Sequence, residues 1–533
     1  METIDPSLMR RIEKAVQLEK AFVEADWEGR LSTTEATRIE PTEKPVIQFN
    51  NQWNLGLEGE IEFLGSSADG PSHSCKISLR LARKGTLADA KSPNFGSRLA
   101  MRSRLVSGVF ELTEGRHTLL AALPQTLSDQ DSHTLLFILT LGNPGASTPA
   151  SPHHNGPVTI ETYRMAMDDW HRIPETIRDD HRQLYEKCRV AAGKGKIERI
   201  DRLSTCATSK DKNMNCMSVV EMSYPTSFGV RNRVPRPERW VYRNAGSSLE
   251  AFVNAATNDI GINYEMMPEL PVWHPTLADG TAQEVALYRM PAFDGFRFSG
   301  AFTVGTSART CLLGVIPLPA GGDPSTRIAL MFASVAGRQK PVPEAMSDVM
   351  VEVLVARGPS VAGPGTADER IRSLLGRPGS IESVAAATVL SGQRSVVSSA
   401  TEWIGPNSPR IVADTMVIPS FEILDQGTNL DVVYERSSGS GPIPITLRFK
   451  HDLRKMVLSL ATHRLKTRGT SYRTLERDVA YKLEVSEKLE LTLGEWTFIK
   501  EIPLEAILGA DDKTAQGQSC HVFARLIRSV PTE

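Results

Sequence analysis

Hydrophobic and polar residues alternate with a period of two along much of this chain of 533 residues. In residues 57–63, apolar side chains and a glycine alternate with glutamates. The same alternation returns at residues 77–81, 135–141, 296–304 and 349–355. Because successive side chains of a β-strand point to opposite faces, this pattern predicts strands with one buried face. Loops rich in glycine, serine, proline and asparagine separate the strands, which favours an antiparallel sandwich or barrel over βαβ units.

Three segments depart from this alternation and set the predicted domain boundaries. Residues 1–40 have apolar residues at helical spacing behind Asp5 and Pro6, which are typical of a helix start, and predict an N-terminal helical arm. Residues 171–215 are charged and indicate a helical connector, whereas residues 363–400 are rich in glycine, alanine and serine and indicate a flexible linker with short helices. The sequence therefore predicts a mainly β protein with three antiparallel β-sandwich domains, at residues 41–170, 216–362 and 401–533.

The first and third of these domains contain similar segments. Val106–Pro124 reads VSGVFELTEGRHTLLAALP and Val485–Pro503 reads VSEKLELTLGEWTFIKEIP, with eight of the nineteen positions identical. Upstream, ISLRL at Ile77 corresponds to ITLRF at Ile445, in the same order along the chain. Two matches in the same order indicate that domain 3 is a possible copy of domain 1. In that case the two segments should occupy equivalent strands.

The composition is that of a globular protein with buried cores. Hydrophobic residues make up 40% and charged residues 23%, and the net charge is -2, so any nucleic-acid contact must come from local patches. The chain has no signal peptide and no apolar run near the roughly 20 residues that span a bilayer, so we expect a soluble protein made in the cytoplasm. Its cysteines form no CxxC pair and are expected to be reduced and mostly buried: Cys75, Cys188, Cys206, Cys216, Cys311 and Cys520.

No catalytic, metal or cofactor motif is recognisable. The stretch from Gly193 to Lys196 lacks the upstream glycine and the following serine or threonine of a phosphate-binding loop. His153 and His154 have no acidic or thiol partner nearby, which favours a solvated loop over a metal site. We therefore predict that the protein is not an enzyme and binds no cofactor. An active site dispersed over several loops is the alternative that a single sequence leaves open.

One segment is markedly basic. Residues 448–477 contain nine cationic residues and only two acidic ones, Asp452 and Glu476. The nine cationic residues are the predicted contact with nucleic acid: Arg448, Lys450, Arg454, Lys455, Arg464, Lys466, Arg468, Arg473 and Arg477. Such a cluster neutralises phosphates, so binding should weaken with salt. Few aromatic residues lie among these cations, which favours backbone contact over base stacking. A solvated surface balanced by acidic segments elsewhere is the alternative.

The middle of the chain resembles a viral coat protein. Phe293–Asp323, FDGFRFSGAFTVGTSARTCLLGVIPLPAGGD, is similar to the central strands of jelly-roll coat proteins in picorna-like viruses. In those coat proteins, a strand of alternating apolar and polar residues leads through a short polar turn to an apolar strand that ends in proline and glycine. The run VMVEVLVARGP at Val349–Pro359 is similar to the closing strand of such a domain. Three β domains in one chain resemble the single-chain coat proteins of nepoviruses, in the secovirid group.

This resemblance implies jelly-roll-like domains and a structural role. The protein is then expected to be a capsid protein that assembles with copies of itself into an icosahedral shell around an RNA genome. Its location would be the virion, and the host cytoplasm during synthesis. The alternative is a non-assembling β-sandwich protein that binds nucleic acid or another ligand, such as a viral movement protein. Particle formation distinguishes the two, because a movement protein would bind RNA without forming a closed shell.

Overall fold

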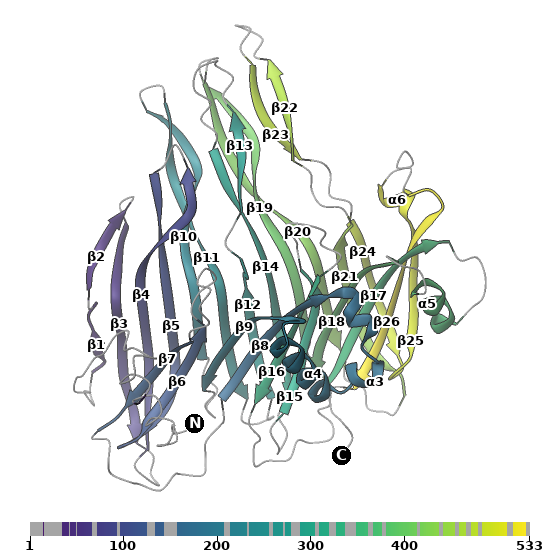
Figure 1. Ribbon diagram of the computed structural model, residues 1–533, viewed down its shortest axis with the longest axis horizontal. Helices are drawn as coiled ribbons and strands as arrows, with labels where there is room; N and C mark the ends of the chain where they lie inside the picture. Colours follow the sequence, from purple (N-terminus) through teal and green to yellow (C-terminus); the bar gives the residue numbers. More distant parts are fainter. Residues whose placement is uncertain are drawn as a thin grey trace.

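The structure is a computed structural model of the full chain. It describes residues 14, 35–41, 43–48, 51–66, 72–92, 96–124, 134–142, 157–206, 214–231, 234–254, 259–269, 272–278, 288–303, 309–318, 327–335, 348–360, 366–375, 380–412, 416–435, 441–453, 458–464, 471–477, 482–508 and 515–528. These residues form two antiparallel sheets and a few short helices (Figure 1). The predicted mainly β class is therefore confirmed.

The larger sheet has 16 strands among the described residues. Its main path runs through β1 (Thr37–Ile39), β3 (Asn51–Ser66), β4 (Ser72–Ser92), β5 (Gly96–Thr113), β10 (Met214–Arg231), β11 (Val234–Asn254), β12 (Asp259–Met266), β14 (Tyr288–Thr303), β19 (Arg394–Val412), β20 (Met416–Tyr434), β21 (Ile443–Asp452) and β24 (Lys482–Leu491). Off this path lie β2 (Glu43–Gln48), β13 (Val272–Ala278), β22 (Leu458–Arg464) and β23 (Ser471–Arg477).

The smaller sheet has 10 strands among the described residues. In spatial order they are β25 (Trp496–Pro503), β26 (Gln518–Arg528), β17 (Asp348–Pro359), β18 (Ile381–Leu390), β15 (Arg309–Pro317), β16 (Arg327–Val335), β8 (Pro157–Ala166), β9 (Glu198–Cys206), β6 (His117–Pro124) and β7 (Thr134–Thr140).

The main hydrophobic core lies between the two sheets. Phe296, Phe298 and Phe302 of β14 are buried there, on the face opposite Arg297, as the alternation predicts. Residues of the smaller sheet, such as Val353 of β17, belong to the same cluster. Burial of these side chains removes apolar area from water, which stabilises the fold at about 25 cal/mol per Å². The two sheets therefore pack as the layers of a sandwich.

The middle of the smaller sheet is covered on its outer face as well. Helices α2 (Met167–Arg172), α3 (Glu175–Arg178) and α4 (His181–Gly193) lie there, and Trp170 and Leu184 pack in a second cluster with Leu330 and Phe332 of β16. Because strands buried on both faces need apolar residues at every position, this cover explains the continuous apolar run in β15. Asp180 caps α4 by accepting a hydrogen bond from the Gln183 amide at 3.0 Å.

Strands from all three predicted sandwich domains pair within the same two sheets. In the larger sheet β5 pairs with β10 and β14 pairs with β19. In the smaller sheet β8 pairs with β16 and β17 pairs with β26. Both sheets therefore continue across the predicted boundaries among the described residues. The ability of each domain to fold by itself stays a prediction.

The predicted flexible linker at 363–400 is wrong for most of its described part. Helix α5 (Ala367–Leu375) is present, but β18 and the first residues of β19 are central strands of the two sheets. The alanines of β18 are fully buried. Opposite them, a Cβ on Gly314 would lie 3.0 Å from the Ala386 carbonyl oxygen, so small residues fill a tight space here. Their composition reflects close packing rather than flexibility.

The other predicted connecting segments have different outcomes. The N-terminal helical arm at 1–40 lies almost entirely outside the described residues, and its described end forms β1. The helical connector at 171–215 is helical as far as Gly193. From Glu198 to Cys206 it is wrong, because these residues form β9, which pairs with β8 and β6. The connector therefore lies on the smaller sheet and ends within it.

Candidate functional sites

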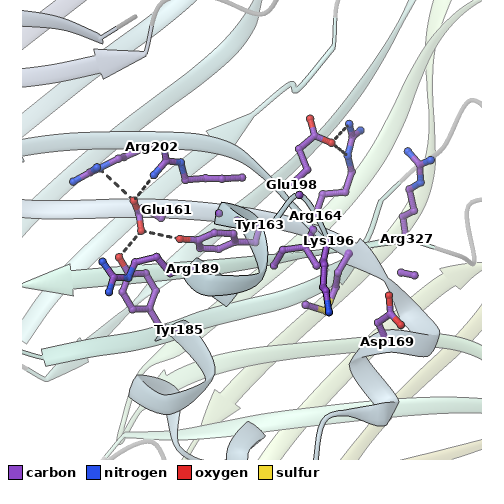
Figure 2. Close-up of a pocket in the computed structure, with 17 residues that line it drawn as sticks. Glu161, Tyr163, Arg164, Asp169, Tyr185, Arg189, Lys196, Glu198, Arg202 and Arg327 are labelled. Carbon is purple, nitrogen blue, oxygen red and sulfur yellow. Dashed lines mark hydrogen bonds and ion pairs between the residues drawn. The ribbon is translucent and has the colours of Figure 1, made fainter. Parts of the chain in front are cut away.

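A pocket of about 1040 Å³ opens on the outer face of the smaller sheet (Figure 2). Strand β8 supplies Glu161, Tyr163 and Arg164, and α4 supplies Tyr185. The rest of the lining comes from α2, the turn after α4, β9 and the start of β16. Glu161 and Tyr163 are two residues apart on one strand, so their side chains point to the same face. Helix α4 crosses that face and places Tyr185 against both.

A buried carboxylate organises one half of the pocket. Glu161 accepts hydrogen bonds from the hydroxyls of Tyr185 at 2.5 Å and Tyr163 at 3.1 Å. Its other oxygen lies 3.3 Å from Arg202 and 3.5 Å from Arg199. Burial and the hydrogen bond to Glu161 raise the pKa of Tyr185 to about 12, and burial with the same carboxylate raises the pKa of Tyr163 further. Both phenols are therefore neutral donors at neutral pH and would not act as nucleophiles.

The other half of the pocket carries uncompensated positive charge. Arg164 is held by Glu198 at 2.6 Å and Glu269 at 2.8 Å. Lys196 and Arg327 are exposed, and neither has a carboxylate partner among the residues that the structure describes. The whole lining contains six cations and three carboxylates: Arg164, Arg189, Lys196, Arg199, Arg202 and Arg327 against Glu161, Asp169 and Glu198. Such a concave, positively charged surface attracts anionic groups such as phosphates.

The described part of the predicted basic segment lies in two places. Arg448 and Lys450 lie on β21, where Arg448 is exposed and Lys450 lines a shallow pocket on the outer face of the larger sheet. Arg464 lies on β22, and Arg473 and Arg477 lie on β23, in a hairpin that extends beyond the sandwich in Figure 1. The remaining four positions lie outside the described residues: Arg454, Lys455, Lys466 and Arg468. A joint surface for all nine cations stays a prediction.

A second charged cluster is buried beneath helices α2 and α3. Glu352 of β17 accepts from Arg525 of β26 at 2.7 Å and from Arg178 of α3 at 3.1 Å. Burial alone would raise the pKa of Glu352, but the two guanidinium groups together lower it below its ordinary value. Arg525 lies over the Trp496 ring, 4.9 Å from its centroid. These contacts join the helices to the sheet.

The thiols are structural where the structure describes them. Cys75, Cys188, Cys216, Cys311 and Cys520 are free and buried, which confirms the expectation for these five residues. Burial raises the pKa of Cys75 to about 11 and the pKa values of Cys188 and Cys520 to about 12. Within the described ranges no group of histidine, cysteine and carboxylate side chains could hold a metal ion, and no helix is long and apolar enough to cross a membrane.

The ends of the sandwich present open strand edges. In the smaller sheet β7 pairs only with β6 and β25 only with β26, as far as the described strands go. In the larger sheet the path ends at β1 and at β24. Leu136 on β7 is 38% exposed, and its neighbours Leu135, Ile138 and Leu139 are partly exposed. An apolar edge strand of this kind readily pairs with a strand from another chain.

Sequence reasoning located neither the pocket nor the open edges. Glu161 gave no clear signal, because it lies on the face of the strand VTIETYRMA opposite the core residues Val158 and Ile160, where a charged side chain is ordinary. In the structure α4 and β9 cover this face and supply the partners of Glu161. Those partners could not be identified, because α4 and β9 both fell within the predicted helical connector.

Comparison with known proteins gives no relative: no family model, no curated protein and no solved structure matches this chain.

Proposed function

We propose that the protein is a coat protein that assembles with copies of itself into an icosahedral shell around an RNA genome. The observation that supports this most is the open edges at both ends of a large two-layer sandwich. A shell needs rigid blocks with surfaces that pair laterally, and this sandwich offers both. The mature protein would be found in the virion, and in the host cytoplasm during synthesis.

Local positive charge supports contact with the genome. The pocket around Arg164 and Lys196 has more cations than carboxylates, although the whole chain has a net charge of -2. Arg448 and Lys450 add positive charge on the opposite face of the sandwich. Cations placed on a surface bind phosphates without reading sequence, which suits a protein that encloses a whole genome.

Assembly is tested on the purified full chain. We expect particles far larger than the 58.5 kDa monomer in light scattering, closed shells in negative-stain images, and RNA that resists nuclease. A monomer at every protein and salt concentration would contradict the proposal. A monomer that still binds RNA would instead favour the second candidate, a non-assembling nucleic-acid-binding protein, for which the cationic pocket is the supporting feature.

The pocket yields a prediction about RNA binding. Lys196→Glu combined with Arg327→Glu should weaken binding to single-stranded RNA of any sequence, because two exposed cations of the pocket lining are lost. If both contact phosphates, the slope of log K against log salt should fall by about 1.4, at roughly 0.7 per contact. Fluorescence anisotropy with labelled RNA at several salt concentrations measures this slope.

The control reverses the same number of charges outside the pocket. Arg182 and Lys187 are exposed on α4 and do not line the pocket, so Arg182→Glu with Lys187→Glu should change the slope much less. Equal effects of the two double variants would mean that the pocket has no special role. A third variant replaces Lys455, Arg464, Lys466 and Arg468 by glutamine and tests the predicted basic segment in the same assay.

A further inference from the structure

The two similar segments turn from one sheet to the other in the same way. Each crosses from the larger to the smaller sheet at a glycine with positive φ, 74° at Gly115 and 80° at Gly494. The Gly115 amide donates to the Leu141 carbonyl at 2.7 Å, and the Gly494 amide donates to the Leu526 carbonyl at 2.8 Å. These glycines are aligned in the two segments, so the same residue makes the same turn.

The strands that follow share an irregularity at the same place. The ladder between β6 and β7 shifts register between Leu119 and Ala121. The ladder between β25 and β26 shifts between Phe498 and Lys500, which are the aligned positions. The side chains differ at these positions, so backbone geometry matches where the sequences do not.

The strands before the turn correspond as well, with one difference. β3, β4 and β5 pair in that order, as do β20, β21 and β24. Val106 lies opposite Leu79, whereas its counterpart Val485 lies opposite Phe449. The ISLRL and ITLRF matches are therefore displaced by two residues, a shift that keeps every side chain on the same face. Strand by strand, β3 to β7 correspond to β20, β21, β24, β25 and β26.

The two corresponding groups of strands, β3 to β7 and β20, β21, β24, β25 and β26, have the same order along both sheets, so they are arranged head to tail. Read from the β7 end, the smaller sheet begins with β7 and β6 and finishes with β26 and β25. Here β7 corresponds to β26, and β6 corresponds to β25. Along the larger sheet β3–β4–β5 and β20–β21–β24 also correspond in the same order. Figure 1 shows the two groups at opposite ends of the sandwich. The edges at the two ends are therefore different from each other, and those of β7, β25 and β24 each match an edge that is occupied inside the chain.

The internal neighbours show what each open edge accepts. The open side of β7 corresponds to the side of β26 that pairs with β17, from Val349 opposite Arg528 to Pro359 opposite Gln518. The open side of β25 corresponds to the side of β6 that pairs with β9, and the open side of β24 to the side of β5 that pairs with β10. All three internal pairings are antiparallel. The open edges of β7, β25 and β24 thus have the backbone geometry of edges that accept an antiparallel strand.

We propose that two copies of the chain associate head to tail, with β25 and β24 of one copy pairing with β7 and β1 of the next. Both pairs would be antiparallel. In the smaller sheet, β25 runs against β26, and β7 runs in the same direction as its counterpart β26. In the larger sheet, β1 runs against β3, whose counterpart is β20. The apolar side chains on β7 would meet Ile499 and Ile502 of β25, which are partly buried against the main core, and Phe498, which packs in the separate cluster with Ile371 and Leu374 of α5. Such a heterologous contact extends both sheets and does not close on itself in a dimer. This inference rests on the proposed self-assembly and names its contact.

Cysteine cross-linking tests the pairing with the full chain. Leu136→Cys on β7 and Lys500→Cys on β25 are made in separate chains, mixed, and treated with a short bismaleimide. We expect a cross-link between the two variants in the mixture and little within either variant alone. The native cysteines Cys75, Cys188, Cys216, Cys311 and Cys520 are buried, which keeps the background from them low. Cross-linked products identified by mass spectrometry distinguish the 136–500 pair from the others.

A charge at the edge supplies the second arm. Leu136→Lys should weaken association at least tenfold in analytical ultracentrifugation, because it puts a charge into an apolar contact. Val190→Lys, at a 50% exposed site on α4, is the matched control and should leave association unchanged. Cross-links of 136 to 136 or 500 to 500 would overturn the head-to-tail arrangement. Large oligomers without any edge cross-link would overturn it while the proposed function survives, whereas a chain that stays monomeric would contradict both.

Discussion

Glu352→Ala is expected to destabilise the folded chain by about 3–5 kcal/mol, the largest effect of any single substitution considered for this protein. Glu352 is 1% exposed and lies between Arg525 and Arg178, which are themselves buried. Its removal leaves two guanidinium groups in a low-dielectric environment without their main counter-charge. Uncompensated buried charge costs far more than the net contribution of a well-formed ion pair.

Urea denaturation followed by tryptophan fluorescence measures this loss. Trp496 and Trp170 are suitable probes, because they lie 4.9 Å and 5.2 Å from the guanidinium carbons of Arg525 and Arg178. Glu175→Ala is the matched control, since Glu175 contacts the same two arginines but its side chain is 56% exposed. We expect a loss of about 0–1 kcal/mol there, as for other exposed pairs.

A double variant separates the charge from the volume. Replacing Glu352 and Arg525 together by methionine should cost less than Glu352→Ala alone, because fewer buried charges are left without a partner. A Glu352→Ala protein within 1 kcal/mol of the wild type would mean that water or nearby Glu175 and Asp179 compensate the arginines.

Local alternation predicted the strands well but not their partners. The pattern at residues 296–304 correctly separates buried Phe296 and Phe298 from exposed Arg297, because one face of β14 lies on the core. The partner of β14 on one side is β19, about a hundred residues later, and no local pattern carries that information. In β18 the prediction of a flexible linker from small residues was wrong for a physical reason, since buried alanines in a tightly packed sheet have the composition of a linker.

The candidate sites depended still more on long-range pairing. Glu161 lies on the face of β8 that points away from the main core, and Tyr185, Arg199 and Arg202 reach it only because α4 folds back over β8 and β9 returns beside it. The similarity of Val106–Pro124 and Val485–Pro503 was visible in the sequence. Its consequence for the edges required the order of the strands in both sheets.

A histidine at the start of α4 makes stability depend on pH. Leu312 of β15 donates its backbone N–H to Nδ1 of His181 at 3.1 Å, so this nitrogen must be an acceptor and the ring neutral. Burial lowers the pKa of His181 to about 4; Arg309 lowers it too, and Asp348 and Asp180 oppose the shift. The N-terminus of α4 also disfavours a cation at this position.

The sign of the effect follows from proton binding. Between pH 6.5, where histidine titrates in the unfolded chain, and about pH 4, the unfolded chain binds a proton that the folded chain excludes. Stability is therefore fully present above pH 6.5 and falls as the pH decreases through this window. The contribution of His181 is on the order of 3 kcal/mol, at about 1.4 kcal/mol per pKa unit. Buried His451, whose pKa burial also lowers to about 4, changes stability in the same direction.

His181→Asn should remove this part of the pH dependence. The asparagine oxygen can accept the Leu312 N–H as Nδ1 does, but it does not titrate. The difference in unfolding free energy between pH 7 and pH 4 should then be smaller than in the wild type by about 3 kcal/mol. Urea midpoints at several pH values measure it, with His117→Asn, at a partly exposed site, as the control. If the wild type and His181→Asn lose stability in parallel as the pH falls, then protonation of His181 does not carry the acid sensitivity, which lies elsewhere in the chain.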